Sequence, residues 1–200
     1  MSLKDRALEW APIYRAWQGP FQDPKFEPVV AHNKMDGIRR VLDVGCGPGT
    51  NAPYFSQCEY LGVDINPGYI ASAKRRYRRE FITADVTAFE LEAEPFDFIL
   101  VNSFFHHVSD AETDRILHHL GTLLAEEGHI HILDLVLPEG PSLARLLARL
   151  DRGDHPRPLS RWKEIFEHHF EPVVFEPYSL GPAGITFWNM VYFKGALRHP

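Results

Sequence analysis

The sequence has little cysteine and no long apolar run. Of its 200 residues only Cys46 and Cys58 are cysteines. That is too few for a disulfide scaffold, so we expect two reduced, packed thiols. The longest apolar runs have the length of a strand and fall far short of the ~20 residues that a membrane span requires. Residues 1–6 are charged and lack the apolar stretch of a signal peptide. We therefore expect a cytoplasmic protein without a membrane partner.

Basic residues are also in short supply. The chain has 21 lysines and arginines against 27 aspartates and glutamates, a formal net charge of −6. This charge argues against nucleic acid or an anionic membrane as the main partner. The basic run at residues 74–79 has one aromatic residue and is typical of a solvated helix C-terminus. Apolar residues make up 44% of the chain, and the length fits a single domain over residues 1–200.

From residue 38 onward, strand-length apolar runs alternate with amphipathic segments of helix length, which is typical of βαβ units in a parallel sheet. Asn66 predicts the N-cap of one helix, and Ser109 with Glu112 predicts a capping box at another, which Gly128 is placed to end. The last two apolar runs are close enough in sequence to pair antiparallel. Strands are expected at residues 40–44, 60–64, 81–83, 96–101, 129–137, 173–175 and 186–193, and further helices at 50–57, 143–150 and 160–169.

We expect four regions within the one domain. Residues 1–36 form an N-terminal helical cap, in which residues 3–17 have apolar spacing compatible with a helix. Residues 37–137 form the ligand-binding core. Residues 138–170 form a substrate-side insert, punctuated by proline and glycine, followed by a helix, and a connection of that length between strands usually carries function. Residues 171–200 form the antiparallel C-terminal strands.

A glycine-rich segment at residues 43–50, Asp-Val-Gly-Cys-Gly-Pro-Gly-Thr, follows the first expected strand. Gly45, Gly47 and Gly49 permit a sharp turn and let a ligand approach the backbone closely, so they predict a ligand site. The spacing differs from the dinucleotide pattern Gly-x-Gly-x-x-Gly, because the third glycine comes one residue early. Asp43 would repel a pyrophosphate and attract a cationic amine or sulfonium. A cationic or zwitterionic ligand is therefore expected.

Two acids stand at the ends of the next two strands. Asp64 closes the second strand, where a carboxylate can accept bonds from both vicinal hydroxyls of a ribose, a feature shared with NAD sites. Asp85 follows the third strand, where it can accept a bond from an adenine amine or cap a turn, and both interpretations stay open. Ribose and adenine contacts would then lie at the same sheet edge as the glycine loop.

Three segments in this order, residues 41–50, Gly-Val-Asp at 62–64 and Ala-Asp-Val at 84–86, resemble the motifs of the class I S-adenosylmethionine-dependent methyltransferases. The resemblance covers roughly residues 40–136. It implies an α/β fold, a Rossmann-like three-layer sandwich whose mostly parallel seven-stranded sheet has an antiparallel C-terminal edge strand. It also implies that nine residues bind S-adenosylmethionine: Asp43, Gly45, Gly47, Gly49, Asp64, Ile65, Asp85, Val86 and Asn102.

The resemblance implies methyl transfer to a small-molecule acceptor by in-line displacement, with S-adenosylhomocysteine as the product. Such a transfer depends mainly on alignment of the reactants. His106 and His107 are candidates for a base that takes a proton from the acceptor, with a slight preference for His106, and histidines that only pack and hold the loop are the alternative. Residues 102–105, Asn-Ser-Phe-Phe, depart from the Asn/Asp-Pro-Pro-aromatic motif of enzymes that methylate adenine or glutamine amides.

Acceptor contacts are expected from the cap and the insert, where the resemblance is weaker. Tyr14 and Gln18 in the cap are candidates to close over the cofactor or the acceptor, with ordinary helix packing as the alternative. Arg152 and Arg157 in the insert suit a carboxylate or phosphate on the acceptor if their guanidinium groups point inward. A solvated loop with internal ion pairs is equally compatible.

No metal site is predicted. Histidines occur in adjacent pairs at 118–119 and 168–169, but adjacent side chains on a helix diverge by ~100°, and the sequence has no zinc-ligand spacing. Two other functions stay open. One is a non-catalytic S-adenosylmethionine-binding module whose aromatic C-terminal strands serve a partner, and the other is a nucleotide-dependent oxidoreductase that uses the same sheet edge. The oligomeric state is not predicted.

Overall fold

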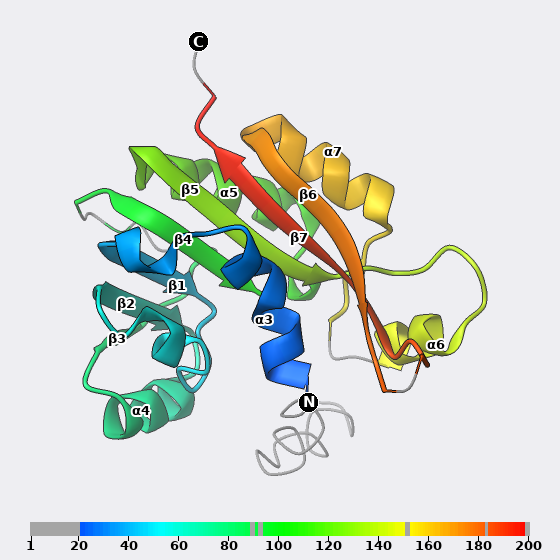
Figure 1. Ribbon diagram of the computed structural model, residues 1–200, viewed down its shortest axis with the longest axis horizontal. Coiled ribbons are helices and arrows are strands. Elements are labelled where there is room, and N and C mark those ends of the chain that lie inside the picture. Colours follow the sequence, from blue (N-terminus) through cyan, green and yellow to red (C-terminus); the bar gives the residue numbers. More distant parts are fainter. Residues whose placement is uncertain (1–20, 89–90, 92–93, 151–152, 183, 199–200) are drawn as a thin grey trace.

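The computed structural model describes residues 21–88, 91, 94–150, 153–182 and 184–198. They form one seven-stranded sheet of order β3-β2-β1-β4-β5-β7-β6 (Figure 1). The first five strands are parallel, and β7 pairs antiparallel with both β5 and β6. The fold class and the antiparallel C-terminal pair are confirmed, with β7 inside the sheet and β6 at its edge. The strands are β1 (Arg40–Val44), β2 (Glu59–Asp64), β3 (Glu80–Thr83), β4 (Phe96–Asn102), β5 (Leu124–Leu135), β6 (Glu171–Leu180) and β7 (Trp188–Ala196).

Helices cover both faces of the sheet, which gives three layers (Figure 1). Alternate strand residues face opposite layers. In β1, Leu42 and Val44 join the apolar cluster under α5 and α7, whereas Val41 joins the cluster under α3 and α4. A third cluster lies between α6 and the ends of β5, β6 and β7. The helices are α3 (Gln22–Ala31), α4 (Pro67–Arg76), α5 (Asp110–Thr122), α6 (Leu143–Leu150) and α7 (Leu159–His169).

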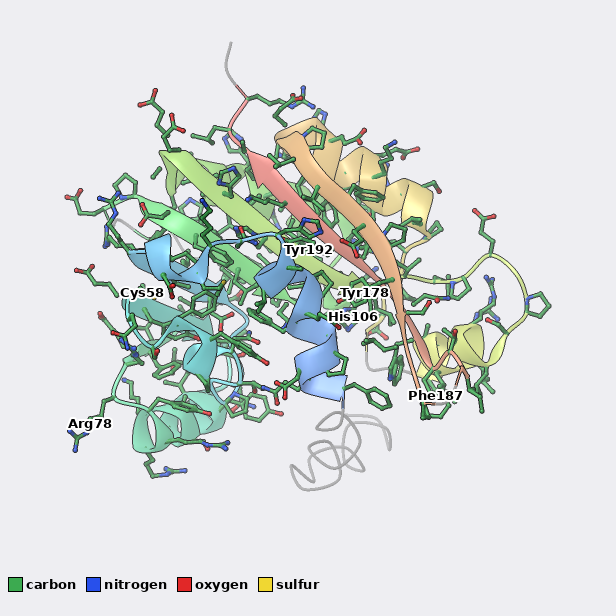
Figure 2. All side chains as sticks on the ribbon, in the orientation of Figure 1. Cys58, Arg78, His106, Tyr178, Phe187 and Tyr192 are labelled. Atoms are coloured by element: carbon green, nitrogen blue, oxygen red, sulfur yellow. The ribbon has the colours of Figure 1, made fainter. Side chains whose placement is uncertain are left out.

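The predicted helix starts are present. The Asn66 side chain accepts bonds from the Gly68 and Tyr69 N–H groups at the start of α4. Ser109 and Glu112 form the reciprocal capping box of α5. The basic residues in the last turn of α4 and just after it are largely exposed, and Arg78 extends into solvent (Figure 2), which confirms the solvated helix end. None of the described helices is both long enough and apolar enough to cross a membrane.

Two predicted helices are wrong in extent. The helix expected at residues 50–57 is only a short 3-10 turn, η3 (Ala52–Phe55). Residues 124–128, expected to belong to the preceding helix, form the start of β5. A Cβ at Gly128 would lie 2.8 Å from the backbone oxygen of Phe96. That glycine is therefore needed for close strand approach rather than to end a helix.

The helix α3 lies within the expected helical cap of residues 1–36, but no helix was predicted at its own position. Pro24 and Pro28 both lie in it, and prolines argue against a helix interior. Burial of Phe26 and Val29 against the sheet compensates for them. The helix expected at residues 3–17 lies outside the described residues. The two cysteines are free and buried, as expected.

Candidate active site

The carboxyl ends of β1, β2 and β4 meet at one edge of the sheet, where the glycine loop follows β1. Gly45, Gly47 and Gly49 have φ values of 69°, 54° and 79°, which side chains rarely adopt. A Cβ at Gly45 would also lie 2.9 Å from the Phe104 ring. The predicted sharp turn is therefore present, and only glycine fits it.

Asp64 fixes the glycine loop at the end of β2. One carboxylate oxygen accepts the Gly47 N–H at 2.8 Å, and the other accepts the Asn66 N–H at 2.8 Å. Each carboxylate oxygen has a second lone pair, so both can still accept a ligand hydroxyl. The next residue, Ile65, is 64% exposed, which leaves an apolar surface beside the carboxylate.

Asp85 and Val86 follow β3. Asp85 is exposed, and its Oδ1 accepts bonds from the Thr87 N–H and hydroxyl at 2.9 and 2.7 Å. These two bonds hold the pKa of Asp85 below its ordinary value. The structure therefore shows that Asp85 caps a turn, while its contact with adenine stays a prediction. Val86 is half-buried against the core.

A chain of buried polar groups runs beneath the loop. Asp43 is fully buried, and it accepts hydrogen bonds from the Tyr60 hydroxyl at 2.5 Å and from Asn51 Nδ2 at 3.2 Å. Burial raises the pKa of Asp43 to about 7, because the bonds from Tyr60 and Asn51 offset only part of the desolvation. Asp43 has no exposed surface, so its carboxylate is not placed for direct contact with a ligand, and its attraction for a cationic group stays a prediction.

The chain of polar groups ends at Asn102. Its Nδ2 donates to Asn51 Oδ1 at 3.1 Å. Its own Oδ1 is buried and accepts no bond from any described residue. A buried polar atom without a partner costs free energy. This amide oxygen at the end of β4 is thus an acceptor that a ligand ammonium can satisfy.

The helix α3 lies over this edge and is tied to it at several points. Gln22 Nε2 donates to the Thr50 carbonyl at 2.9 Å, and Lys25 Nζ donates to the Ser103 hydroxyl. Ser103 has a φ of 55°, the only positive value among the described non-glycine residues. Tyr178 (Figure 2) donates to the Lys25 carbonyl at 2.9 Å. Ser103, the residue that follows Asn102, therefore has a strained backbone and contacts the half-buried ammonium of Lys25.

His106 and His107 form the turn η4 (Phe105–His107) after β4. His106 is 3% exposed, and its Nδ1 lies 2.6 Å from Oδ1 of the fully buried Asp134. Asp134 Oδ2 also accepts the Phe105 N–H at 2.8 Å. His107 is exposed, and its ring centroid lies 4.1 Å from that of His106. These contacts favour the holding role for His106, and the role of either histidine as a base stays a prediction.

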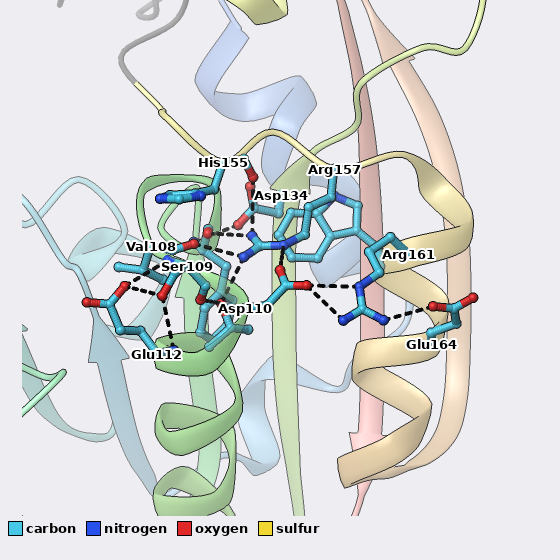
Figure 3. A network of polar contacts seen from close by, with 12 residues as sticks. Val108, Ser109, Asp110, Glu112, Asp134, His155, Arg157, Arg161 and Glu164 are labelled. Atoms are coloured by element: carbon cyan, nitrogen blue, oxygen red, sulfur yellow. Dashed lines mark hydrogen bonds and ion pairs between the residues drawn. The ribbon is translucent and has the colours of Figure 1, made fainter.

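Of the two interpretations left open for Arg157, the structure favours internal contacts over a ligand contact. Its guanidinium is 5% exposed and donates to the carbonyls of Phe105 and Val108, each at 2.8 Å, and to Asp110 at 2.6 Å (Figure 3). It also lies 4.7 Å from the Trp162 ring centroid. Arg157 therefore fastens the insert to η4 and to the start of α5. Arg152, Tyr14 and Gln18 lie outside the described residues.

Gly153 packs directly on His106. A Cβ there would overlap the imidazole and would lie 2.6 Å from the His106 carbonyl oxygen. Gly153→Ala is expected to lower the free energy of unfolding by about 1–3 kcal/mol, because the insert or the ring must shift. Urea denaturation measures this. Gly140→Ala is the control, since a Cβ there meets nothing within 4 Å, and equal losses in both variants would contradict the contact.

Comparisons with known proteins agree on a family. Residues 41–128 match the family described as "Methyltransferase domain". The trans-aconitate 2-methyltransferase of Methylobacterium radiotolerans is 31% identical over 141 residues, 66% of this chain and 51% of the relative. These matches support the assignment of the chain to the class I S-adenosylmethionine-dependent methyltransferases. It spans about half the length of the first curated relatives that it matches.

A second curated relative and a solved structure extend the comparison. A malonyl-[acyl-carrier protein] O-methyltransferase of Enterobacter lignolyticus is 35% identical over 95 residues, 46% of this chain and 38% of the relative. The crystal structure of an S-adenosylmethionine-dependent methyltransferase from Methanosarcina mazei superposes with a TM-score of 0.70 at 18% identity, over 85% of this chain and 98% of that one. That likeness supports the fold, and S-adenosylmethionine is the cofactor of the family.

The residues at the sheet edge fit S-adenosylmethionine. The left-handed glycines leave room beside the backbone, Asp64 can accept the ribose hydroxyls, and Asn102 Oδ1 lacks a donor among the described residues. The cofactor carries two hydroxyls and an ammonium that match these acceptors.

The sequence did not identify Asn51, Tyr60, Lys25 or Asp134 as parts of this sheet edge. The one signal available was Asp134, a carboxylate inside the apolar run of residues 130–137. A buried acid in such a strand requires a partner.

Proposed function

We propose that this methyltransferase-family chain transfers the methyl group of S-adenosylmethionine to a small-molecule acceptor. The observation that carries the proposal is the meeting of the left-handed glycine loop, the Asp64 carboxylate and the orphaned Asn102 oxygen at one sheet edge. When bound, the cofactor supplies a methyl group on a positively charged sulfur. Alignment with the acceptor then accounts for much of the acceleration.

The proposed contacts follow from the acceptors and surfaces at this edge. Asp64 binds the ribose hydroxyls, and Ile65 and Val86 flank the adenine. Asp85 accepts a bond from the adenine amine through the oxygen that Thr87 does not use. Asn102 Oδ1 accepts from the cofactor ammonium, since that atom accepts no bond from the described residues. In this proposal Asp43 acts from below through Asn51.

A small-molecule acceptor is supported by charge and by the names of relatives. The net charge of −6 disfavours nucleic acid. Two relatives are named for trans-aconitate and a malonyl thioester, both of which carry carboxylates, and the Lys25 ammonium at this edge suits such an anion. We assign the exposed His107 to contact with the acceptor, and the His106–Asp134 pair to holding the segment in place.

Calorimetric titration with S-adenosylmethionine, S-adenosylhomocysteine and NAD tests the cofactor assignment. Asp64→Ala is expected to weaken binding of the first two at least ~10-fold, a loss of about 1.4 kcal/mol, because the ribose acceptors are removed. Glu59→Ala is the matched control, since Glu59 is exposed at the opposite end of β2 and pairs with Arg40. Binding of NAD alone, or unchanged affinity in Asp64→Ala, would contradict the assignment.

Turnover separates this proposal from the non-catalytic alternative. Protein that binds the cofactor is incubated with methyl-labelled S-adenosylmethionine and a panel of small organic acids, alcohols and amines. Label in an acceptor supports the transferase. Cofactor binding without any labelled product would favour the binding module instead.

A further inference from the structure

A polar cleft of about 300 Å³ lies between α5 and α7, on the helices that cover the sheet face opposite α3. Side chains of both helices line it. None of the residues assigned to the cofactor belongs to it. The cleft contains three side chains of types that can bind metals, one from α5 and two from the last turn of α7.

These three side chains are Asp114, His168 and His169, and each offers one ligand atom within 4.8 Å of the other two. His169 Nε2 already lies 2.9 Å from Asp114 Oδ1. Adjacent histidines on one helix diverge, which is why the sequence predicts no metal there. The structure adds a carboxylate from the neighbouring helix, and the two imidazole planes lie at 87° to each other. With Asp114 on α5, the two histidines of α7 become part of a group of three ligands that lie close together.

The charges around the cleft suit a cation. Arg161 also lines the cleft, and its guanidinium donates to Glu164 at 2.9 Å and to Asp110 at 2.7 Å. Arg157 donates to Asp110 as well, so these two arginines are balanced by two carboxylates and the charge of Asp114 remains for a cation.

We propose that Asp114, His168 and His169 form a binding site for a divalent transition metal of the zinc class. Two imidazoles and one carboxylate are a common ligand set for zinc, cobalt and nickel, whereas magnesium and calcium prefer oxygen ligands alone. A fourth position remains for water in the open cleft. The ion replaces the direct His169–Asp114 hydrogen bond and cross-links α5 to α7. It thereby stabilises the folded state, because the unfolded chain has no preformed site.

The test uses tag-free protein, since a histidine tag would bind the same ions. Calorimetric titration with Zn²⁺ is expected to give one saturable site in the wild type, and Co²⁺ is expected to give the visible absorption of a low-symmetry nitrogen and oxygen site. His168→Ala and Asp114→Asn each remove one ligand and are expected to weaken Zn²⁺ binding at least ~10-fold. His168 and Asp114 are both exposed, so both variants should fold, and circular dichroism checks this.

His32→Ala is the matched control. His32 Nε2 lies 2.7 Å from Glu176 Oε2, an exposed histidine–carboxylate pair that belongs to no described three-ligand cluster. Its removal is expected to leave Zn²⁺ affinity and the Zn²⁺-dependent rise in melting temperature unchanged, whereas His168→Ala abolishes that rise. Absence of a saturable site, or equal weakening in His32→Ala and His168→Ala, would overturn the proposal. None of these measurements depends on methyl transfer.

Discussion

Asp134→Ala is expected to lower the free energy of unfolding by about 3–5 kcal/mol. Asp134 is fully buried and holds the Nδ1 of His106 at 2.6 Å and the backbone N–H of Phe105 at 2.8 Å. Its removal leaves both groups buried without an acceptor and opens a cavity. The segment after β4 then loses its fixed position, so cofactor and acceptor binding should weaken as well.

Urea denaturation, followed by circular dichroism, measures the loss. Asp134→Asn keeps the shape and one acceptor oxygen, so its loss should be clearly smaller. Asp154→Ala, on an exposed aspartate of the insert, is the control and should change stability by less than about 0.5 kcal/mol. A loss below about 1 kcal/mol in Asp134→Ala would show that the pair does not stabilise the fold.

The His106–Asp134 pair also predicts how the free energy of unfolding depends on pH. Burial by itself raises the pKa of Asp134, but the charge and hydrogen bond of His106 outweigh it and hold the pKa below its ordinary value. An acid with a depressed folded pKa stabilises the fold above its unfolded pKa and loses that contribution as the pH falls through the folded pKa. The stability gap between the wild type and Asp134→Ala should therefore narrow only in acid, below about pH 4.

Local patterns in the sequence predict most of the fold. The apolar alternation after residue 38 marks the parallel strands, and the caps at Asn66 and Ser109 mark two helix starts, because each depends on neighbours within a few positions. The glycine loop and Asp64 are visible for the same reason. Family motifs concentrate in such short segments, which is why the class of cofactor follows from them.

Features that depend on distant partners could not be predicted. The helix α3 contains two prolines and exists because Phe26 and Val29 are buried on the sheet. Arg157 lies in a charged segment whose composition suggests an exposed loop, but it donates to the carbonyls of Phe105 and Val108, about fifty positions earlier in the sequence. The third metal ligand, Asp114, comes from a helix separate from the two histidines. Only tertiary packing brings such groups together.

Asp43→Asn is expected to make the protein increasingly more stable than the wild type as the pH rises. Burial raises the pKa of Asp43 from its ordinary value of 3.8 to about 7, so the folded state holds a proton that the unfolded state releases between these pH values. An acid whose pKa is raised in the folded state stabilises the fold at low pH, and this contribution is lost as the pH rises through the folded pKa. An asparagine does not titrate, and its amide oxygen can still accept a bond from Tyr60.

The size of the effect follows from the two pKa values. One pKa unit is about 1.4 kcal/mol, so the advantage of Asp43→Asn over the wild type should grow by about 3 kcal/mol between pH 5 and pH 8. Urea denaturation of both proteins without cofactor, at several pH values, measures the difference. Asp36→Asn, on an exposed carboxylate, should run parallel to the wild type over this range. Parallel curves for Asp43→Asn would mean that the buried carboxylate ionises as freely in the folded protein as in the unfolded chain. The hydrogen-bonded groups from Tyr60 to Asn102 would then stabilise the ionised form of Asp43 rather than its protonated form.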